Sequence, residues 1–211
     1  MPGREPSRPD YEQSVFINCP FDDDYRPLFH AVVFTVHVLG LVPRCSLEAS
    51  DSGSVRIQTI ISLIEYCRWG IHDISRTELN ANGLPRFNMP LELGIFLGAQ
   101  RLGSRSQKRK SCLVLDRDPY RYQEFISDIA GQDIASHGGE PVKAISAVRN
   151  WLATSMRNQS FPGGRDIGVR FRQFQRDLPG TCLKLKIQPD ELTFAEYSRI
   201  TFDWLIDNLT T

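Results

Sequence analysis

Short runs of β-branched and aromatic residues alternate along the chain with longer segments in which apolar residues recur every three or four positions. The short runs are typical of buried strands, and the longer segments are typical of amphipathic helices. The predicted strands are 14–19, 41–48, 69–75 and 111–116. Strands that are joined by helices pair in parallel, so the pattern predicts an α/β, flavodoxin-like three-layer fold with a central, mostly parallel sheet.

Helical periodicity follows each predicted strand and continues beyond the last one. The predicted helices are 25–40, 55–67, 86–99, 120–130, 141–156, 167–177 and 193–209. Ser54 is a suitable N-cap for the second helix, and Thr193 with Glu196 forms the capping-box pattern of the last. We therefore expect a flexible tail over 1–12, an α/β domain over 13–157, and a mainly helical C-terminal extension, 158–211, packed on the core.

Composition narrows the class of protein. The 211 residues are 41% hydrophobic and 24% charged, with 25 basic and 25 acidic side chains. The chain therefore lacks the excess of positive charge that is typical of proteins that bind nucleic acids. No run approaches 18 apolar residues, so no membrane association is expected. Five scattered cysteines without a C-x-x-C pair indicate reduced thiols in a cytoplasmic protein. The four histidines show no metal-binding spacing, and no metal is expected.

Ligands of open parallel sheets bind beyond the carboxyl ends of the strands, so the residues that follow each strand are candidates for binding. They are Asn18, Phe21 and Asp22 after the first strand, Ser52 after the second, and Asp73 and Ser75 after the third. The ring of Phe21 can stack on a base or belong to the core. Arg56, near the start of the second helix, can pair with a phosphate or remain a solvated surface residue.

Glu92 is the only charged residue between Met89 and Ala99. Pro90 favours the first helical turn, so we expect Glu92 to lie among the unpaired N–H groups, where the helix dipole keeps it ionised. Either it caps the helix or it performs chemistry. Gly94 and Gly98 are expected to let this helix approach the sheet closely.

Three segments together carry a resemblance: "VFINCPFDDDY", "GIHDIS" and "NMPLELGIFLGA". They resemble the superfamily that contains bacterial TIR-like (Toll/interleukin-1 receptor-like) domains and the nucleoside 2-deoxyribosyltransferases. The resemblance covers about residues 14–116, and its most specific part is Asn88, four residues before Glu92. Members of this superfamily cleave N-glycosidic bonds of NAD or nucleosides with the equivalent glutamate.

The resemblance implies that Glu92 and Asp73 are catalytic and that Asn88 contributes to substrate binding. The leading hypothesis is a TIR-like NAD glycohydrolase or cyclase, a bacterial defence effector that self-associates or meets a partner for activation, with NAD as substrate and no cofactor. Nicotinamide leaves without needing a proton, whereas a neutral base needs an acid such as Asp73. The alternatives are a nucleoside deoxyribosyltransferase or N-glycosidase, and a non-catalytic nucleotide-binding or interaction module in which Glu92 caps its helix.

Overall fold

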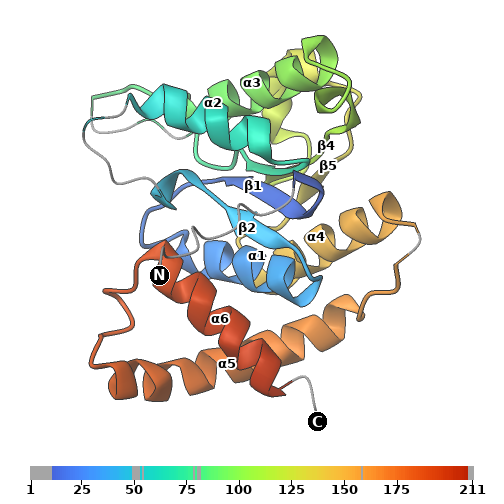
Figure 1. The fold of residues 1–211 in the computed structure, drawn as a ribbon. Coiled ribbons are helices and arrows are strands. Elements are labelled where there is room, and N and C mark those ends of the chain that lie inside the picture. Colours follow the sequence, from blue (N-terminus) through green and yellow to red (C-terminus); the bar gives the residue numbers. More distant parts are fainter. Residues whose placement is uncertain are drawn as a thin grey trace.

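A five-stranded, all-parallel sheet forms the centre of the computed structural model (Figure 1), which describes residues 11–48, 53, 55–77, 79, 82–157 and 159–208. The strands are β1 (Ser14–Asn18), β2 (Val42–Arg44), β3 (Trp69–Asp73), β4 (Ser111–Asp116) and β5 (Ile134–Ser136). Their order, β2-β1-β3-β4-β5, is that of flavodoxin-like sheets. The predicted fold class is therefore confirmed, and the four predicted strands correspond to β1 to β4.

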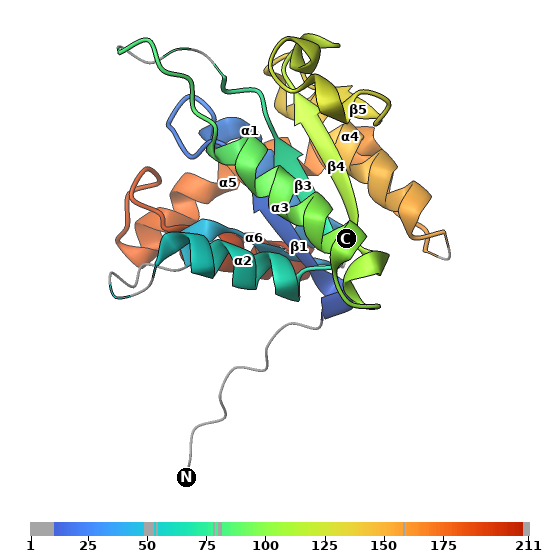
Figure 2. The same ribbon diagram turned by 90° about the horizontal axis from the view of Figure 1, so that it is seen from above.

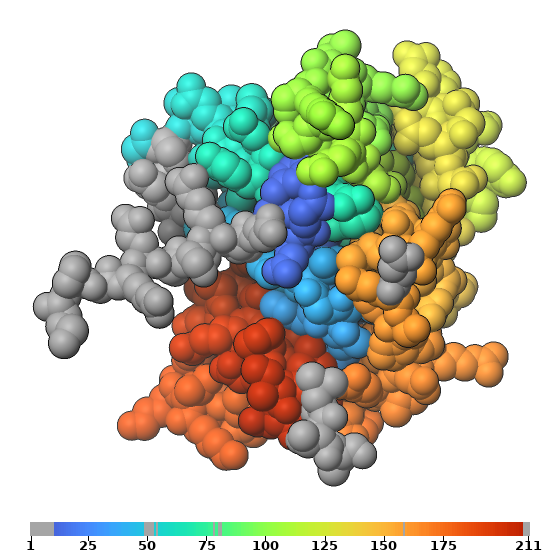
Figure 3. Space-filling view, turned by 45° about the vertical axis from the view of Figure 1, so that its right-hand side comes forward, coloured from blue at the N-terminus to red at the C-terminus, as the bar shows by residue number. Residues whose placement is uncertain are grey.

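Helices cover both faces of the sheet (Figure 1). They are α1 (Arg26–Val38), α2 (Arg56–Tyr66), α3 (Asn88–Leu102), α4 (Pro141–Ser155), α5 (Gly164–Leu185) and α6 (Phe194–Asn208). Helices α2 and α3 lie on one face, and α1 and α4 lie on the other. Helices α5 and α6 pack on α1 and α4 from outside, and Figure 3 shows the orange and red surface of α5 and α6 next to the blue of α1.

The central strand β1 shows why the sheet needs cover on both faces. All five of its residues are buried. Val15 and Ile17 join the core cluster beneath α1 and α4, while Phe16 points to the opposite face and packs with Phe96 of α3. Strands that are buried on both faces have such continuous apolar runs in place of polar alternation.

The segment between β4 and α4 differs from the prediction. The expected helix over 120–130 is two short 3₁₀ turns, Arg121–Glu124 and Ser127–Ile129, and the connection that follows contains β5. The guanidinium group of Arg121 donates to the Asp116 carboxylate at the end of β4 and to the backbone carbonyl of Ile74. These long-range contacts fix the segment, and local periodicity does not report them.

Helix α5 is longer than the predicted 167–177 and continues through Pro179. Its buried residues Ile167, Phe171, Phe174, Leu178 and Cys182 recur at helical spacing along its whole length. This apolar face packs on α1, where Phe174 stacks on Phe34. Tertiary packing therefore outweighs the local cost of the proline.

The predicted helix starts had different outcomes. The capping box before α6 is confirmed, because Thr193 N donates to Glu196 Oε2 at 2.9 Å and Glu196 N donates to Thr193 Oγ1 at 3.3 Å. Ser54, the predicted cap of α2, lies outside the described residues.

All five cysteines are free thiols, and no helix in the described part of the chain is long and apolar enough to cross a membrane.

Candidate active site

Glu92 lies on the buried face of α3, in line with Met89 and Phe96. The backbone N–H of Leu91 already bonds to the carbonyl of Phe87 at 2.9 Å, so the helical hydrogen bonds begin before Glu92. The prediction that Glu92 lies among the unpaired N–H groups is therefore wrong. Glu92 belongs to the row of side chains that faces the core, and accordingly only 8% of the residue is exposed.

The carboxylate of Glu92 makes no hydrogen bond or ion pair within the part of the chain that the structure describes. Burial raises its pKa to about 7, and the positive charge of Arg56 opposes this rise in part. The expected dipole effect is thus outweighed by the loss of solvation. A buried carboxyl group without a structural partner and with a pKa near neutrality is typical of functional sites.

Helix α3 approaches the sheet at a different glycine from those predicted. Gly94 is exposed, and a Cβ at either Gly94 or Gly98 would meet no atom within 4 Å. A Cβ at Gly70 of β3, in contrast, would lie 2.7 Å from the ring of Phe96. Figure 2 shows α3 crossing above the sheet beside α2, and the contact of Phe96 with Gly70 fixes its height above β3.

Asn18, at the carboxyl end of β1, fixes the first turn of α3. Its amide nitrogen Nδ2 donates to the carbonyl of Met89 at 2.9 Å and lies 3.1 Å from Nδ1 of His72. Burial lowers the pKa of His72 to about 3, so the imidazole is neutral and its Nδ1 accepts this bond. Asn18 is 2% exposed, and its amide nitrogen positions Met89, three residues before Glu92.

Asp73, at the end of β3, is surrounded by donors. Its Oδ2 accepts a 2.6 Å hydrogen bond from the hydroxyl of Tyr25, and Nε2 of His137 lies 3.0 Å from the same oxygen. The backbone N–H of Ser75 donates to Oδ1 at 2.9 Å. Asp73 and His137 are each 1% exposed. The structure thus brings the predicted pair Asp73 and Ser75 together and adds Tyr25 and His137 to them.

Sequence reasoning missed Tyr25 and His137 for separate reasons. Tyr25 follows three aspartates at the start of a helix, a place where an aromatic residue usually belongs to the core. His137 comes directly after β5, a strand of three residues that is not among the predicted strands. The pair of glycines after His137 was the one local sign of a tight turn there.

The thiol of Cys19 lies within electrostatic range of both predicted catalytic carboxylates. Its pKa is raised well above the usual value by burial first, and then by the neighbouring groups, among them the carboxylates of Asp73 and Glu92. Both carboxylates therefore act on the same atom at the carboxyl edge of the sheet. The charge that acts on Glu92 itself is that of Arg56.

Two other predicted site residues have polar partners. Arg56 is the exposed first residue of α2, and its guanidinium donates to the hydroxyl of Ser46 at 3.2 Å. Asp22 accepts a 2.6 Å bond from Arg76 and a 3.0 Å bond from the backbone N–H of Tyr25. Asp22 thereby ties the loop after β1 to the loop after β3.

The remaining predicted site residues lie apart from this network or outside the description. The ring of Phe21 packs edge-on against Phe29 with centroids 5.3 Å apart, on the side of the sheet that α1 covers. Asn88 is exposed at the first position of α3. Ser52 lies outside the described residues. Among those that are described, no three His, Cys, Asp or Glu side chains are placed to hold a metal ion.

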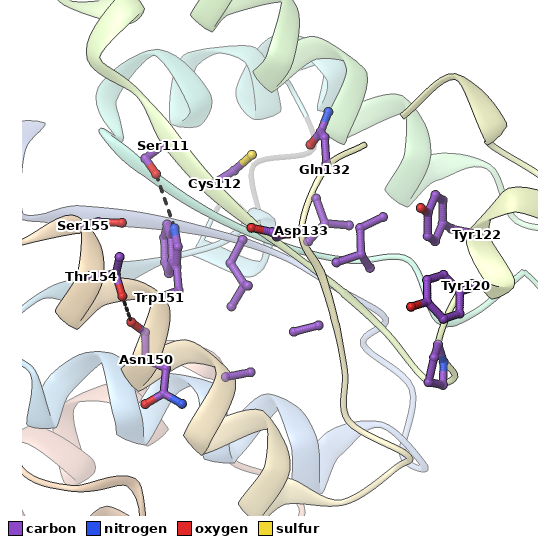
Figure 4. A pocket seen from close by; sticks show the side chains of 16 residues that line it. Ser111, Cys112, Tyr120, Tyr122, Gln132, Asp133, Asn150, Trp151, Thr154 and Ser155 are labelled. Carbon is purple, nitrogen blue, oxygen red and sulfur yellow. Dashed lines mark hydrogen bonds between the residues drawn. The ribbon is translucent and has the colours of Figure 1, made fainter. Parts of the chain in front are cut away.

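A cavity of about 750 Å³ lies between β4, β5 and α4 (Figure 4). Trp151 lines it and donates from its indole nitrogen to the hydroxyl of Ser111 at 3.3 Å. None of the predicted site residues that the structure describes lines this cavity, and its cysteine, Cys112, has a pKa that burial raises to about 11. We therefore place the candidate active site at Glu92 and Asp73 and not in this cavity.

No protein-family model matches the chain, and no curated protein sequence matches it either.

Proposed function

We propose that this protein cleaves the N-glycosidic bond of NAD, as a TIR-like glycohydrolase or cyclase, with Glu92 as the catalytic carboxylate. The observation that carries the proposal is the buried, unpaired Glu92 at the carboxyl edge of a flavodoxin-like sheet. Cleavage of such a bond passes through an oxocarbenium-like state. A fixed carboxylate beside the anomeric carbon stabilises that positive charge or attacks it.

The electrostatics of Glu92 suit a substrate that carries positive charge. Burial removes the water that would solvate the ionised carboxylate, and no described side chain forms an ion pair with it. The pyridinium ring of NAD would bring the missing positive charge to the site and favour the ionised form of Glu92. Arg56, at the start of α2, is the residue best placed to meet a phosphate group of the same substrate.

The contacts of Asp73 support NAD over a neutral nucleoside. Nicotinamide departs as a neutral molecule and needs no proton donor, whereas a purine base generally needs one. Both oxygens of Asp73 already accept bonds from Tyr25 and from the backbone of Ser75, which makes Asp73 a poor source of a proton. We therefore assign Asp73 a substrate-binding role and leave the chemistry to Glu92.

A nucleoside deoxyribosyltransferase or N-glycosidase is the second candidate, and one observation favours it. A carboxyl group with a pKa of about 7 is partly protonated at neutral pH, so Glu92 could itself give a proton to a leaving base. A non-catalytic module has no such support. In that alternative Glu92 caps α3, yet no side chain caps this helix and Glu92 lies beyond its first turn.

Rates of base release from NAD and from deoxyadenosine, measured for Glu92→Gln and Asp73→Asn, separate these candidates. On NAD we expect Glu92→Gln to abolish release and Asp73→Asn to lose less, by at least the roughly 10²-fold that an acid catalyst contributes. Asp118→Asn, at an exposed carboxylate after β4, is the matched control. Each assay is repeated at high protein concentration, because we propose that self-association activates the enzyme.

Equal losses for both variants on NAD, with both proteins folded by circular dichroism, would contradict the NAD assignment. Base release from deoxyadenosine alone would move the protein to the second candidate. A wild type that is inert towards both compounds at every concentration would favour a non-catalytic module.

A further inference from the structure

Asp73 is held by residues from three separate parts of the fold. Tyr25 precedes α1, Ser75 follows β3, and His137 follows β5. Tyr25 and His137 both approach Oδ2 of Asp73, at 2.6 and 3.0 Å, while the N–H of Ser75 bonds to Oδ1. The orientation of this carboxylate is therefore set by tertiary structure and not by β3 alone.

The geometry of His137 identifies which of its nitrogens carries the proton. Its Nδ1 accepts a 2.9 Å bond from the backbone N–H of Gly139, so in the neutral ring the proton is on Nε2, the atom that faces Asp73. Gly138 and Gly139 have φ values of 57° and 77°, which glycine adopts without strain. The turn is thus built to aim Nε2 at Asp73, although the contact lacks the alignment of a regular hydrogen bond.

Tyr25 is a permanent donor to the same oxygen. Burial and the Asp73 carboxylate raise the pKa of its hydroxyl well above the usual value, so the phenol stays protonated. Tyr25 is 3% exposed, and its ring lies edge-on to that of His137 with centroids 6.4 Å apart. The hydroxyl of Tyr25 bonds to Oδ2 of Asp73 and Nε2 of His137 crowds the same oxygen, so a further partner would meet less obstruction at Oδ1.

A carboxylate offers about four lone-pair positions, two on each oxygen. Oδ2 uses one position on Tyr25 and has Nε2 of His137 in contact without a regular hydrogen bond, and Oδ1 uses one position on Ser75. Within the described ranges of the chain no other side chain or backbone group donates to Oδ1. Each oxygen of this buried carboxylate therefore keeps one acceptor position, and Oδ1 is the less crowded of the two because only the backbone N–H of Ser75 approaches it.

We propose that Tyr25 and His137 are positioning residues, which turn the Asp73 carboxylate so that Oδ1 accepts a hydrogen bond from a ribose hydroxyl of the substrate. This inference rests on the proposed function, and it adds a preference for ribosyl over 2′-deoxyribosyl substrates. Tyr25 and His137 act through Asp73 and do not touch the substrate themselves.

The test compares NAD with its analogue that lacks the 2′-hydroxyl on the nicotinamide ribose. Values of kcat and KM are measured for the wild type, Tyr25→Phe, His137→Leu and His137→Gln. Tyr197→Phe is the matched control, because Tyr197 is equally buried but donates to the backbone of His30. Loss of one hydrogen bond to a charged group predicts a fall in kcat/KM on NAD of about tenfold or more.

Tyr25→Phe and His137→Leu should show that fall on NAD and little change on the deoxy analogue, whereas His137→Gln, which keeps an N–H donor, should recover part of the activity. Tyr197→Phe should leave the ratio between the two substrates unchanged. Equal losses on both substrates would mean that the cluster only supports the fold, and no loss would mean that it does not orient Asp73. Either result overturns the inference while NAD cleavage by the wild type stands. A wild type that does not cleave NAD overturns both proposals.

Discussion

Glu92 is costly to the folded protein, because burial removes water from a carboxylate and no described residue replaces that water with a hydrogen bond. Asn18 and Phe96 explain why the cost persists. The first holds the start of α3 through Met89, and the second fixes the same helix over Gly70 of β3. Rigid packing on both sides of Glu92 thus holds a charged group in a place that stability alone would not select.

This cost predicts that Glu92→Gln stabilises the protein at alkaline pH. The folded-state pKa of about 7 lies above the usual 4.5, so the folded protein binds more protons than the unfolded chain between these values. Stability therefore falls as pH rises from 4.5 to 7, by about 1 to 3 kcal/mol. Denaturant unfolding should show that Glu92→Gln raises the free energy of unfolding at pH 8 by that amount more than it does at pH 4.5. The same change in unfolding free energy at both pH values would contradict a raised pKa for Glu92 in the folded protein.

At the scale of single residues, the sequence singled out Glu92 for an incomplete reason. Glu92 stood out as the one charge in an apolar helix, and its burial follows from that pattern. The expected dipole effect did not decide its pKa, because the helix begins four residues earlier and desolvation is larger. Tyr25 and His137 could not be predicted, since their role arises only when loops far apart in the sequence meet at Asp73.

At the scale of elements, periodicity predicted those that bury a long apolar face. Strands β1, β3 and β4 have such faces and lie where the sequence placed them. Strand β5 has three residues, too few for a period of two to be recognised, and it is defined by its pairing with Val114 to Asp116 of β4. The 3₁₀ turns before it depend likewise on Arg121 and its contacts with the ends of β3 and β4.

Two glycine substitutions test which glycine sets the distance between α3 and the sheet. Gly94→Ala should stabilise the protein by about 0.5 to 1 kcal/mol, because an alanine there meets no neighbour and lowers the entropy of the unfolded chain. Gly70→Ala should destabilise it by about 1 to 3 kcal/mol, because its Cβ would overlap the ring of Phe96. Thermal unfolding of both variants checks the pair, and the reverse order of stabilities would contradict this packing.

At the scale of the whole molecule, the C-terminal helices support the loop that carries Tyr25. The ring of His30 on α1 stacks on Tyr197 of α6 with centroids 3.7 Å apart, and His37 lies 2.8 Å from the hydroxyl of Ser198. Phe194, at the start of α6, contacts Phe29 of α1. Helix α1 is therefore held between the sheet and the outer helices, which fixes its N-terminal end beside Asp73.

The pH dependence of nicotinamide release from NAD tests the central claim, that Glu92 acts as an ionised carboxylate, most directly. Because its pKa is about 7, kcat/KM should rise as pH increases through that value and reach a plateau near pH 8, while Glu92→Gln should release no nicotinamide at any pH. Matched scans of wild type and variant, at protein concentrations that permit self-association, provide the measurement. A rate that falls as pH rises through 7, or release by Glu92→Gln that equals release by the wild type, would contradict the claim.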